Sequence, residues 1–322
     1  MRLPALAAAV VLAASAGAQA QSYPSKPVTV IVPFAAGGAT DVLARFLGER
    51  LRAVLGQPII IENVTGAGGS IGVNRLVRAG ADGYTLEIGT STTNVLLGGL
   101  YPLQFDLIND LAPVLQIASE PLLIVGKKNL PANDLKALIA WLKANPDKAS
   151  IGIPAVGGTG HLAGLSFLKE IGAQAQFIPY RGNGPALQDL VAGQIDLQIE
   201  PASNFYQQAK AGAIKPFAIA AKSRVAVADD IPTTDEAGLP GFYASLWYGL
   251  WAPKDTPKDV IARLNAAMLE ALAHDETRKR FADLGLQTPP RAQQTPEALL
   301  AFQKSEAEKW WPVIKAANIK GQ

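Results

Sequence analysis

Four short stretches of this 322-residue sequence have the composition of an anion-binding loop. Each is rich in glycine or hydroxyl residues, follows a short apolar run and precedes a segment with helical character. Glycine allows backbone N–H groups to approach a ligand closely, and a helix N-terminus favours negative charge. One such loop can be a tight turn that binds nothing, but four in equivalent positions predict a site that holds a carboxylate with neutral donors. The stretches are FAAGGATD (34–41), GTSTTN (89–94), AVGGTGHL (155–162) and YRGNGPA (180–186).

Nucleotide-binding patterns fit these loops poorly. No glycine is followed by Lys and then by Ser or Thr, as the phosphate-binding P-loop requires. GTGHLA (158–163) matches the looser dinucleotide pattern G-x-G-x-x-A, and Arg181 could suit a 2′-phosphate. A predicted signal peptide argues against a soluble nucleotide cofactor, so we expect no cofactor.

A serine hydrolase is the enzymatic alternative. GGSIG (68–72) matches the G-x-S-x-G pattern around Ser70, and His161 or His274 would have to complete a triad. However, the pattern should follow a strand directly, and NVTGAG stands between them. Two histidines and no cysteine also exclude a three-histidine or cysteine-based zinc site. We therefore expect neither catalytic residues nor a metal.

Individual side chains near the loops have two interpretations each. His161 can cap its helix or donate a hydrogen bond to a ligand. Arg181 can pair with a ligand carboxylate or simply line the rim. Glu200, which ends the run IDLQIE, can accept a bond from a ligand hydroxyl or amino group, or from neighbouring backbone N–H groups. Trp247 can line a cleft wall or belong to the core.

The surrounding pattern alternates strands and helices and predicts open α/β sheets. VTVIVPF (28–34) is a buried strand, and leucines spaced by four residues mark the helix that follows it. The pattern restarts after LIND with a strand at 122–125, and two helices close the chain. Because these closing helices have no strands of their own, we expect them to pack on the first unit. The predicted division is lobe 1 at 21–121 plus 248–322 and lobe 2 at 122–247, with crossovers near 120–122 and 245–251.

The first twenty residues read as a secretory signal peptide. Arg2 precedes an apolar run, Leu3 to Ala16, and AQA (18–20) is a cleavage signal before Gln21. The remaining chain of about 300 residues is long enough for two domains. Its net charge is close to zero, which argues against nucleic acid as a partner.

Six stretches together resemble the Bug-type receptors, the periplasmic solute-binding proteins of tripartite tricarboxylate transporters. The likeness covers nearly the whole mature chain in the same order. The stretches are YPSKPVTVIVPFAAGGATDVLARFL, GQPIIIENVTGAGGSIG, DGYTLEIGTS, FIPYRGNGPALQDLVAGQIDL, DIPTTDEAGLPGF and WYGLWAPKDTP. The chain departs from the family at Glu200-Pro201, where Asp-Asn is frequent, and at Val64-Thr65, where Arg-Pro is usual.

This resemblance implies a type II, Venus-flytrap periplasmic binding protein: two open α/β sheets joined by a hinge that closes on a small carboxylate. The loops 34–41 and 155–161 would act as pincers, and the loops 90–94 and 180–183 would complete the pocket. The expected partners are membrane transporter subunits, although a periplasmic sensor remains an alternative, and we expect a monomer. The expected ligand-binding residues are Phe34, Ala36, Gly37, Gly38, Thr40, Asp41, Thr90, Ser91, Asn94, Gly157, Gly158, Thr159, His161, Tyr180, Arg181, Gly182, Glu200 and Trp247.

Overall fold

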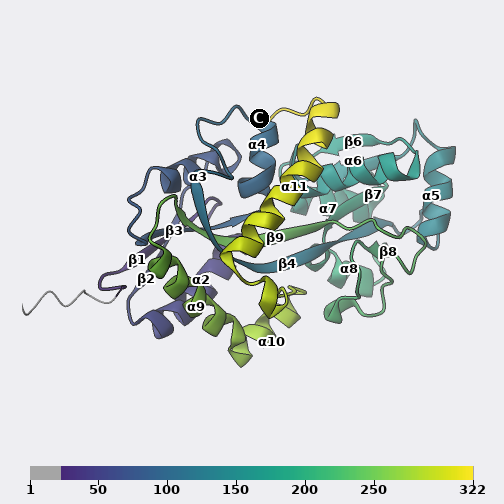
Figure 1. Cartoon of the computed structure of the whole chain (residues 1–322). Coiled ribbons are helices and arrows are strands. Elements are labelled where there is room, and N and C mark those ends of the chain that lie inside the picture. The colour runs from purple at the N-terminus through teal and green to yellow at the C-terminus, as the bar shows by residue number, and fades with distance from the viewer. Residues whose placement is uncertain (1–22, 322) are drawn as a thin grey trace, which may run out of the picture.

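The computed structural model describes residues 23–321, so the predicted signal peptide lies outside the described residues. Within that range no helix combines the length and the apolar character needed to cross a membrane. The described strands form one continuous arrangement in the order β2-β1-β3-β9-β4-β7-β5-β6, with β8 also paired to β4. Figure 1 shows β1–β3 on one side of the molecule and β5–β8 on the other, with β4 and β9 between them.

The first half is built around β1, which pairs in parallel with both β2 and β3. Alternate side chains of a strand point to opposite faces. Accordingly, Val30 and Val32 face α2, whereas Ile31 faces α3. Both faces are therefore buried, which explains the continuous apolar run in the sequence. The elements are β1 (Val28–Val32), α2 (Ala39–Leu55), β2 (Ile59–Asn63), α3 (Ser70–Val77), β3 (Thr85–Thr90), a π-helical turn (Thr92–Leu96) and α4 (Leu97–Leu100).

The two halves are joined by a single long strand, β4 (Leu111–Lys127). Its residues 111–121 pair with β9 (Ser245–Pro253), and residues 122–127 pair with β7 and β8. The prediction of a strand starting at 122 is therefore wrong, because the strand begins eleven residues earlier. Pro113 and Pro121 conceal it in the sequence, and irregular pairing near Pro113 accommodates the first of them.

The second half repeats the pattern of strand, loop and helix. β5 lies between β6 and β7 and is parallel to both. Its core contains Phe167 of α6 against Ile151 and Ile153 of β5. The elements are α5 (Leu135–Ala144), β5 (Ser150–Ile153), α6 (Thr159–Ile171), β6 (Gln176–Pro179), α7 (Asn183–Ala192), β7 (Leu197–Pro201), α8 (Tyr206–Lys210) and β8 (Ile214–Ile219).

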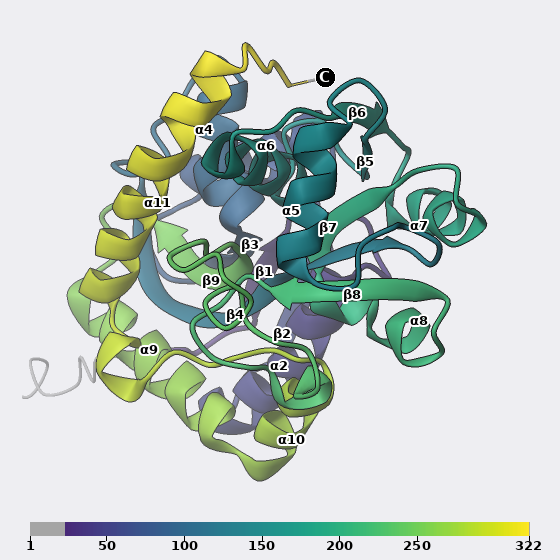
Figure 2. The ribbon, with the colours of Figure 1, turned by 90° about the vertical axis from the view of Figure 1, so that its right-hand side faces the viewer.

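Three helices, rather than the predicted two, follow β9. They are α9 (Lys258–Ala273), α10 (Asp275–Asp283) and α11 (Pro296–Ala316). His274 has an extended backbone and separates α9 from α10. α9 packs on α2 as expected, but α11 contacts both α4 and α6 and therefore touches both halves. Figures 1 and 2 show α11 running beside α4 and α6, and α10 lying beside α2.

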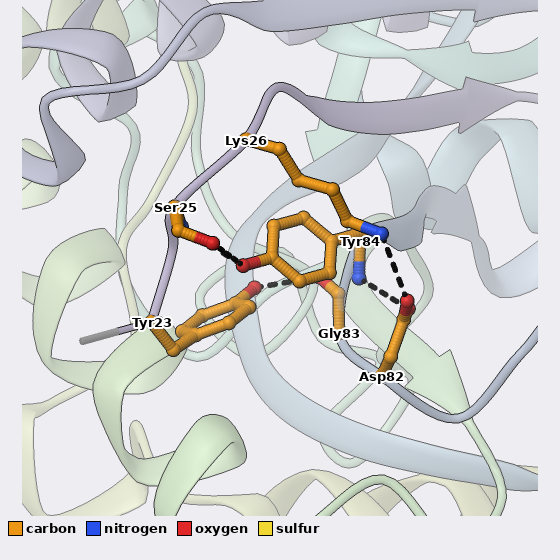
Figure 3. Close-up of polar contacts among 6 residues, drawn as sticks. All are labelled: Tyr23, Ser25, Lys26, Asp82, Gly83 and Tyr84. Carbon is orange, nitrogen blue, oxygen red and sulfur yellow. Dashed lines mark hydrogen bonds and ion pairs between the residues drawn. The ribbon is translucent and has the colours of Figure 1, made fainter. Parts of the chain in front are cut away.

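The first described residues are attached to the beginning of β3 (Figure 3). The Tyr23 hydroxyl donates to the carbonyl of Gly83, and the two rings of Tyr23 and Tyr84 meet edge to face at 5.1 Å. Lys26 pairs with Asp82 at 3.3 Å. These contacts attach the segment before β1 to the segment before β3, the strand that pairs with β1.

Candidate functional site

The strands of the two halves point their carboxyl ends toward each other. β1 and β3 are parallel, and β4 runs in the same direction because β9 lies antiparallel between β3 and β4. β7 is antiparallel to β4, and β5 and β6 run with β7. Since β4 passes from the first half into the second, the loops after β1 and β3 face those after β5 and β6. The four predicted loops therefore lie at the boundary between the halves, where α/β proteins bind ligands.

Two of these loops are in direct contact. The Thr159 hydroxyl lies 3.3 Å from the hydroxyl of Thr92 and 3.5 Å from that of Ser91. Nearby, Gly157 is packed so closely against Leu100 that an added methyl group would lie 2.6 Å from that side chain. The loop after β3 and the loop after β5 thus form one continuous hydroxyl-lined surface across the boundary.

The loops after β1 and β5 have the same backbone geometry. Gly37 and Gly157 both adopt left-handed conformations, with φ of 83° and 78°. Each is followed by an extended glycine, Gly38 or Gly158, which precedes the helix. A positive φ is costly for residues with a side chain, so glycine is required at the first position of each pair.

The same loops are stabilised by different side chains in equivalent positions. Asp41 Oδ2 accepts the N–H of Gly37 at 2.8 Å, and His161 Nδ1 accepts the N–H of Gly157 at 3.0 Å. Bonds from Arg45 and Gly37 lower the pKa of Asp41 to about 2, whereas burial lowers the pKa of His161 to about 4. His161 is therefore a neutral side chain that fixes its own loop through Nδ1. It does not cap the helix as one sequence interpretation had it, because α6 has no side-chain cap, and ligand contact stays a prediction.

Each helix start leaves backbone N–H groups without an acceptor in the described chain. The first backbone bond into α2 is donated by Val42 to Gly38, and that into α6 by Leu162 to Gly158. Neither helix has a side-chain cap at its N-terminus. The unused donors are those of residues 39–41 and 159–161, which makes both helix ends suitable for an anion.

The loop after β6 contributes one free cation. Arg181 is exposed and makes no hydrogen bond or ion pair with any described residue. Gly182 has a φ of 104° and donates to Pro154, which fixes the loop against the end of β5. The Tyr180 hydroxyl is already used, because it donates to Asp189 at 2.7 Å; burial and this bond raise the pKa of Tyr180 to about 12.

Two carboxyl groups meet at the boundary. Glu200, at the end of β7, is partly buried and lies against Gly160 at the start of α6. Burial and the neighbouring Glu120 raise the pKa of Glu200 to about 8. Glu120, on β4, is 4% exposed and accepts the N–H of Ser203 at 2.9 Å. Burial raises the pKa of Glu120 as well.

Four further predicted residues, two of them with hydroxyl side chains, lie in the first loop or beneath the site. Phe34 packs on the first core, and its carbonyl accepts a bond from Asn63. Ala36 is exposed at the loop tip, and Thr40 is buried in the first turn of α2. Thr90 is buried and receives a bond from Thr93 to its carbonyl.

Asn94 and Trp247 are interior residues rather than cleft residues. Asn94 is fully buried beside Glu87, and its Oδ1 accepts a bond from Thr93 at 2.6 Å. Trp247 is fully buried against Trp251 and donates to Glu306 of α11 at 3.2 Å. The sequence could not assign them, because it does not show which face of a strand or turn is covered by α11.

The residues of the proposed triad are not assembled. His161 is committed to Gly157, and the His274 side chain accepts from Glu276. Neither histidine has a hydrogen bond to Ser70, the first residue of α3, in the described chain. Among residues 23–321 there is also no cluster of His, Asp or Glu side chains that could hold a metal ion.

The whole sequence was compared with known proteins. The family described as tripartite tricarboxylate transporter family receptor matches residues 43–319. Protein BugT of Bordetella pertussis is 36% identical over 308 residues, which are 95% of this chain and 94% of BugT. The structure of the periplasmic binding protein BugD matches with a TM-score of 0.77 and 35% identity, over 93% of this chain and all of BugD. The structure of MatC from Rhodopseudomonas palustris, with bound malate, matches with a TM-score of 0.77 and 36% identity, over 91% of this chain and all of that one.

The chain belongs to the tripartite tricarboxylate transporter receptor family. The resemblance seen in the six sequence stretches is thereby confirmed, and so is the predicted α/β periplasmic binding protein fold. The chain is a solute receptor of a binding-protein family, which excludes the serine hydrolase alternative.

The receptor brings to the boundary two groups that the sequence interpretation missed. Glu120 stands in the apolar run ASEPLLIV, the same signal that singled out Glu200, but the strand was thought to begin two residues later. Ser203 lies in a turn after Pro201 that has no recognisable motif. Only the pairing of β4 with β7 places Ser203 next to Glu120.

Proposed function

We propose that this receptor is exported to the periplasm by its signal peptide, binds a small carboxylate between its two halves and delivers it to the membrane subunits of its transporter. Residues 21–121 and 248–322 form one lobe in this proposal, and residues 122–247 form the other. The protein acts as a monomer. The malate bound to the related MatC supports a carboxylate as the ligand.

The observation that carries the proposal is the pair of matching helix starts, α2 and α6, with unused N–H groups at 39–41 and 159–161. Neutral donors can hold a carboxylate without burying an unpaired cation, whose desolvation would cost several kcal/mol. Arg181 lies free in the neighbouring loop to pair with a second anionic group. Such a site binds an anion and can release it again.

We call the two helix starts, with the N–H groups of residues 39–41 and 159–161, the clamp. The test uses one variant in each helix start and titration calorimetry with malate, succinate and citrate. Gly37→Val and Gly158→Val place a branched side chain over the donors of α2 and α6. We expect the wild-type protein to bind at least one of these acids and each variant to lose at least tenfold in affinity, equal to about 1.4 kcal/mol.

Gly56→Val is the matched control. Gly56 ends the same helix, has a φ of 70° and, like Gly37, has no other group within 4 Å of an added methyl. The control therefore introduces a similar backbone strain at the opposite end of α2, far from the N–H groups of residues 39–41. Equal affinities in wild type, Gly37→Val and Gly158→Val would reject the two-helix clamp.

A further inference from the structure

A cavity of about 180 Å³ lies between α2 and α10, next to the start of α2. Its walls are mostly apolar, with Val42 and Phe46 from α2 and Phe281 and Leu284 from α10 and its C-cap. Arg280 of α10 also lines the cavity and is the one cation among its described lining residues. Val42 is 42% exposed although it is a large apolar residue. Figure 2 shows α2 and α10 lying next to each other, which agrees with their shared cavity.

The floor of the cavity contains two polar groups that are not fully used. Tyr248, on β9, is 2% exposed, and its hydroxyl has no hydrogen-bond partner in the described chain. Glu120 accepts the N–H of Ser203 at 2.9 Å, and the Ser203 side chain also interacts with this carboxyl group, which retains further acceptor capacity because a carboxylate has two oxygens with two lone pairs each. Neither the Tyr248 hydroxyl nor the Glu120 carboxyl group belongs to the enclosed side-chain atoms that lack a partner, so both groups are open to the cavity and available to a ligand.

The cavity is continuous with the proposed carboxylate clamp. Gly37 and Ala39, which flank the start of α2, line the same space as Glu120 and Tyr248. A ligand with its carboxylate at the unused N–H groups of α2 can therefore extend between the helices toward the floor. The volume is close to that of a 150 Å³ apolar cavity that accepts benzene.

We propose that this cavity binds the ring of an aromatic carboxylate, and that Tyr248 and Glu120 recognise a hydroxyl group on that ring. This inference rests on the proposed function, because the clamp at α2 holds the carboxylate. The phenolic hydroxyl would donate to the carboxylate of Glu120 and accept from the hydroxyl of Tyr248. The apolar walls would exclude water from the ring.

The test compares malate, benzoate and 4-hydroxybenzoate by titration calorimetry. We expect the wild-type protein to bind 4-hydroxybenzoate about 5 to 100 times more tightly than benzoate, the range for two added hydrogen bonds. Tyr248→Phe removes only the bond from the Tyr248 hydroxyl and leaves the one to Glu120. It should therefore lower the preference for 4-hydroxybenzoate over benzoate several-fold without abolishing it, and an unchanged preference would contradict the role of Tyr248.

Val42→Phe and Leu284→Trp fill the cavity from opposite walls. Each should weaken the binding of both aromatic acids at least tenfold and change the affinity for malate less than twofold. Ile60→Phe enlarges another apolar side chain that is 51% exposed, on β2 and outside the cavity lining, and should change none of the affinities. Thermal melting of each variant verifies that it is folded.

The outcomes separate this inference from the proposed function. Binding of malate without either aromatic acid, or aromatic binding that neither cavity-filling variant weakens, would overturn the inference and leave the receptor function intact. Binding of none of the three acids to the wild-type protein would count against both.

Discussion

Asp41 and His161 perform the same structural task with different chemistry. Each accepts the N–H of a left-handed glycine four residues earlier and so fixes the loop that precedes a helix. Asp41 does this as an anion that also bonds to Arg45 and Asn63. His161 does it as a neutral ring that packs edge to face on Phe177. Mild acid should therefore weaken only the hydrogen bond in the loop after β5, where His161 becomes protonated, and leave the loop after β1 unchanged.

The stability of the receptor should fall between pH 6.5 and 4 because of His161. Its pKa is lowered to about 4 in the folded protein, so the unfolded chain takes up the proton at a higher pH. The stabilisation that comes from keeping His161 neutral is present above the unfolded-state pKa of about 6.5. It is lost as the pH falls from there to about 4, which lowers the free energy of unfolding by about 2–3 kcal/mol.

His161→Asn is the matched variant, because its side-chain oxygen can accept the N–H of Gly157 but does not titrate. Urea unfolding at pH 7.5, 5.5 and 4 measures the difference in unfolding free energy between wild type and this variant. As the pH falls, the unfolding free energy of the wild type should decrease more than that of His161→Asn. Two parallel pH profiles would contradict the assignment.

At the scale of elements, α6 approaches β7 so closely that only glycine fits at the contact. A Cβ atom at Gly160 would collide with the carbonyl of Ile199 and the carboxyl of Glu200. This contact sets the position of the α6 N-terminus, and with it the N–H groups of residues 159–161. Helix placement and ligand binding are thus coupled through one residue.

Gly160→Ala should therefore destabilise the protein by about 1–3 kcal/mol, the usual cost of overpacking, and weaken carboxylate binding by displacing α6. Gly80→Ala is the control, because Gly80 lies between α3 and β3, away from the four loops, with open space around its Cα and no left-handed φ, so both properties should stay close to wild type. Chemical denaturation and calorimetry measure both effects. A Gly160→Ala protein as stable as wild type would show that the close contact between α6 and β7 does not determine where α6 lies.

At the scale of the whole molecule, β4 and β9 form the strand connection between the halves. The halves also touch on either side of these strands: Ser91 and Thr92 meet Thr159 on one side, and Glu120 meets Ser203 on the other. Lys309 of α11 also donates to the carbonyl of Tyr243. Two of the apolar cores lie within one half each, whereas the cluster under α11 takes in Leu162 and Leu165 of α6 and so belongs to both halves. Such an arrangement suits hinge closure around a ligand.

Ligand binding should change the distance between the proposed lobes and leave distances within a lobe unchanged. The chain contains no cysteine, so paired labels can be placed at will. Ile60→Cys with Val191→Cys reports across the lobes, and Ile60→Cys with Ile71→Cys reports within one; all three side chains are exposed. Distance measurements by spin-label spectroscopy with and without a bound acid should differ for the first pair only. If the distance between the labels at positions 60 and 191 were the same with and without ligand, closure of the lobes would be contradicted.

The sequence by itself determined the local features of this receptor. The alternation of strands and helices and the positions of the four loops could be predicted, because periodicity and clusters of glycine are properties of a few neighbouring residues. The left-handed backbone of Gly37 and Gly157 became visible only in the structure. The resemblance of the six stretches also gave the family correctly. The first segment of β4 was missed, because Pro113 and Pro121 oppose a strand locally and only pairing with β9 stabilises it.

The tertiary structure decided which side chains of those segments meet. Glu120, Ser203 and Tyr248 come from β4, a turn after β7 and β9, and they converge only through strand pairing over more than 80 residues. Asn94 and Trp247 belong to the interior because α11 returns from the end of the chain to cover them. Local residue patterns therefore specify the loops, whereas long-range packing specifies which groups face the cleft, because a side chain's environment depends on partners that its neighbours in sequence do not reveal.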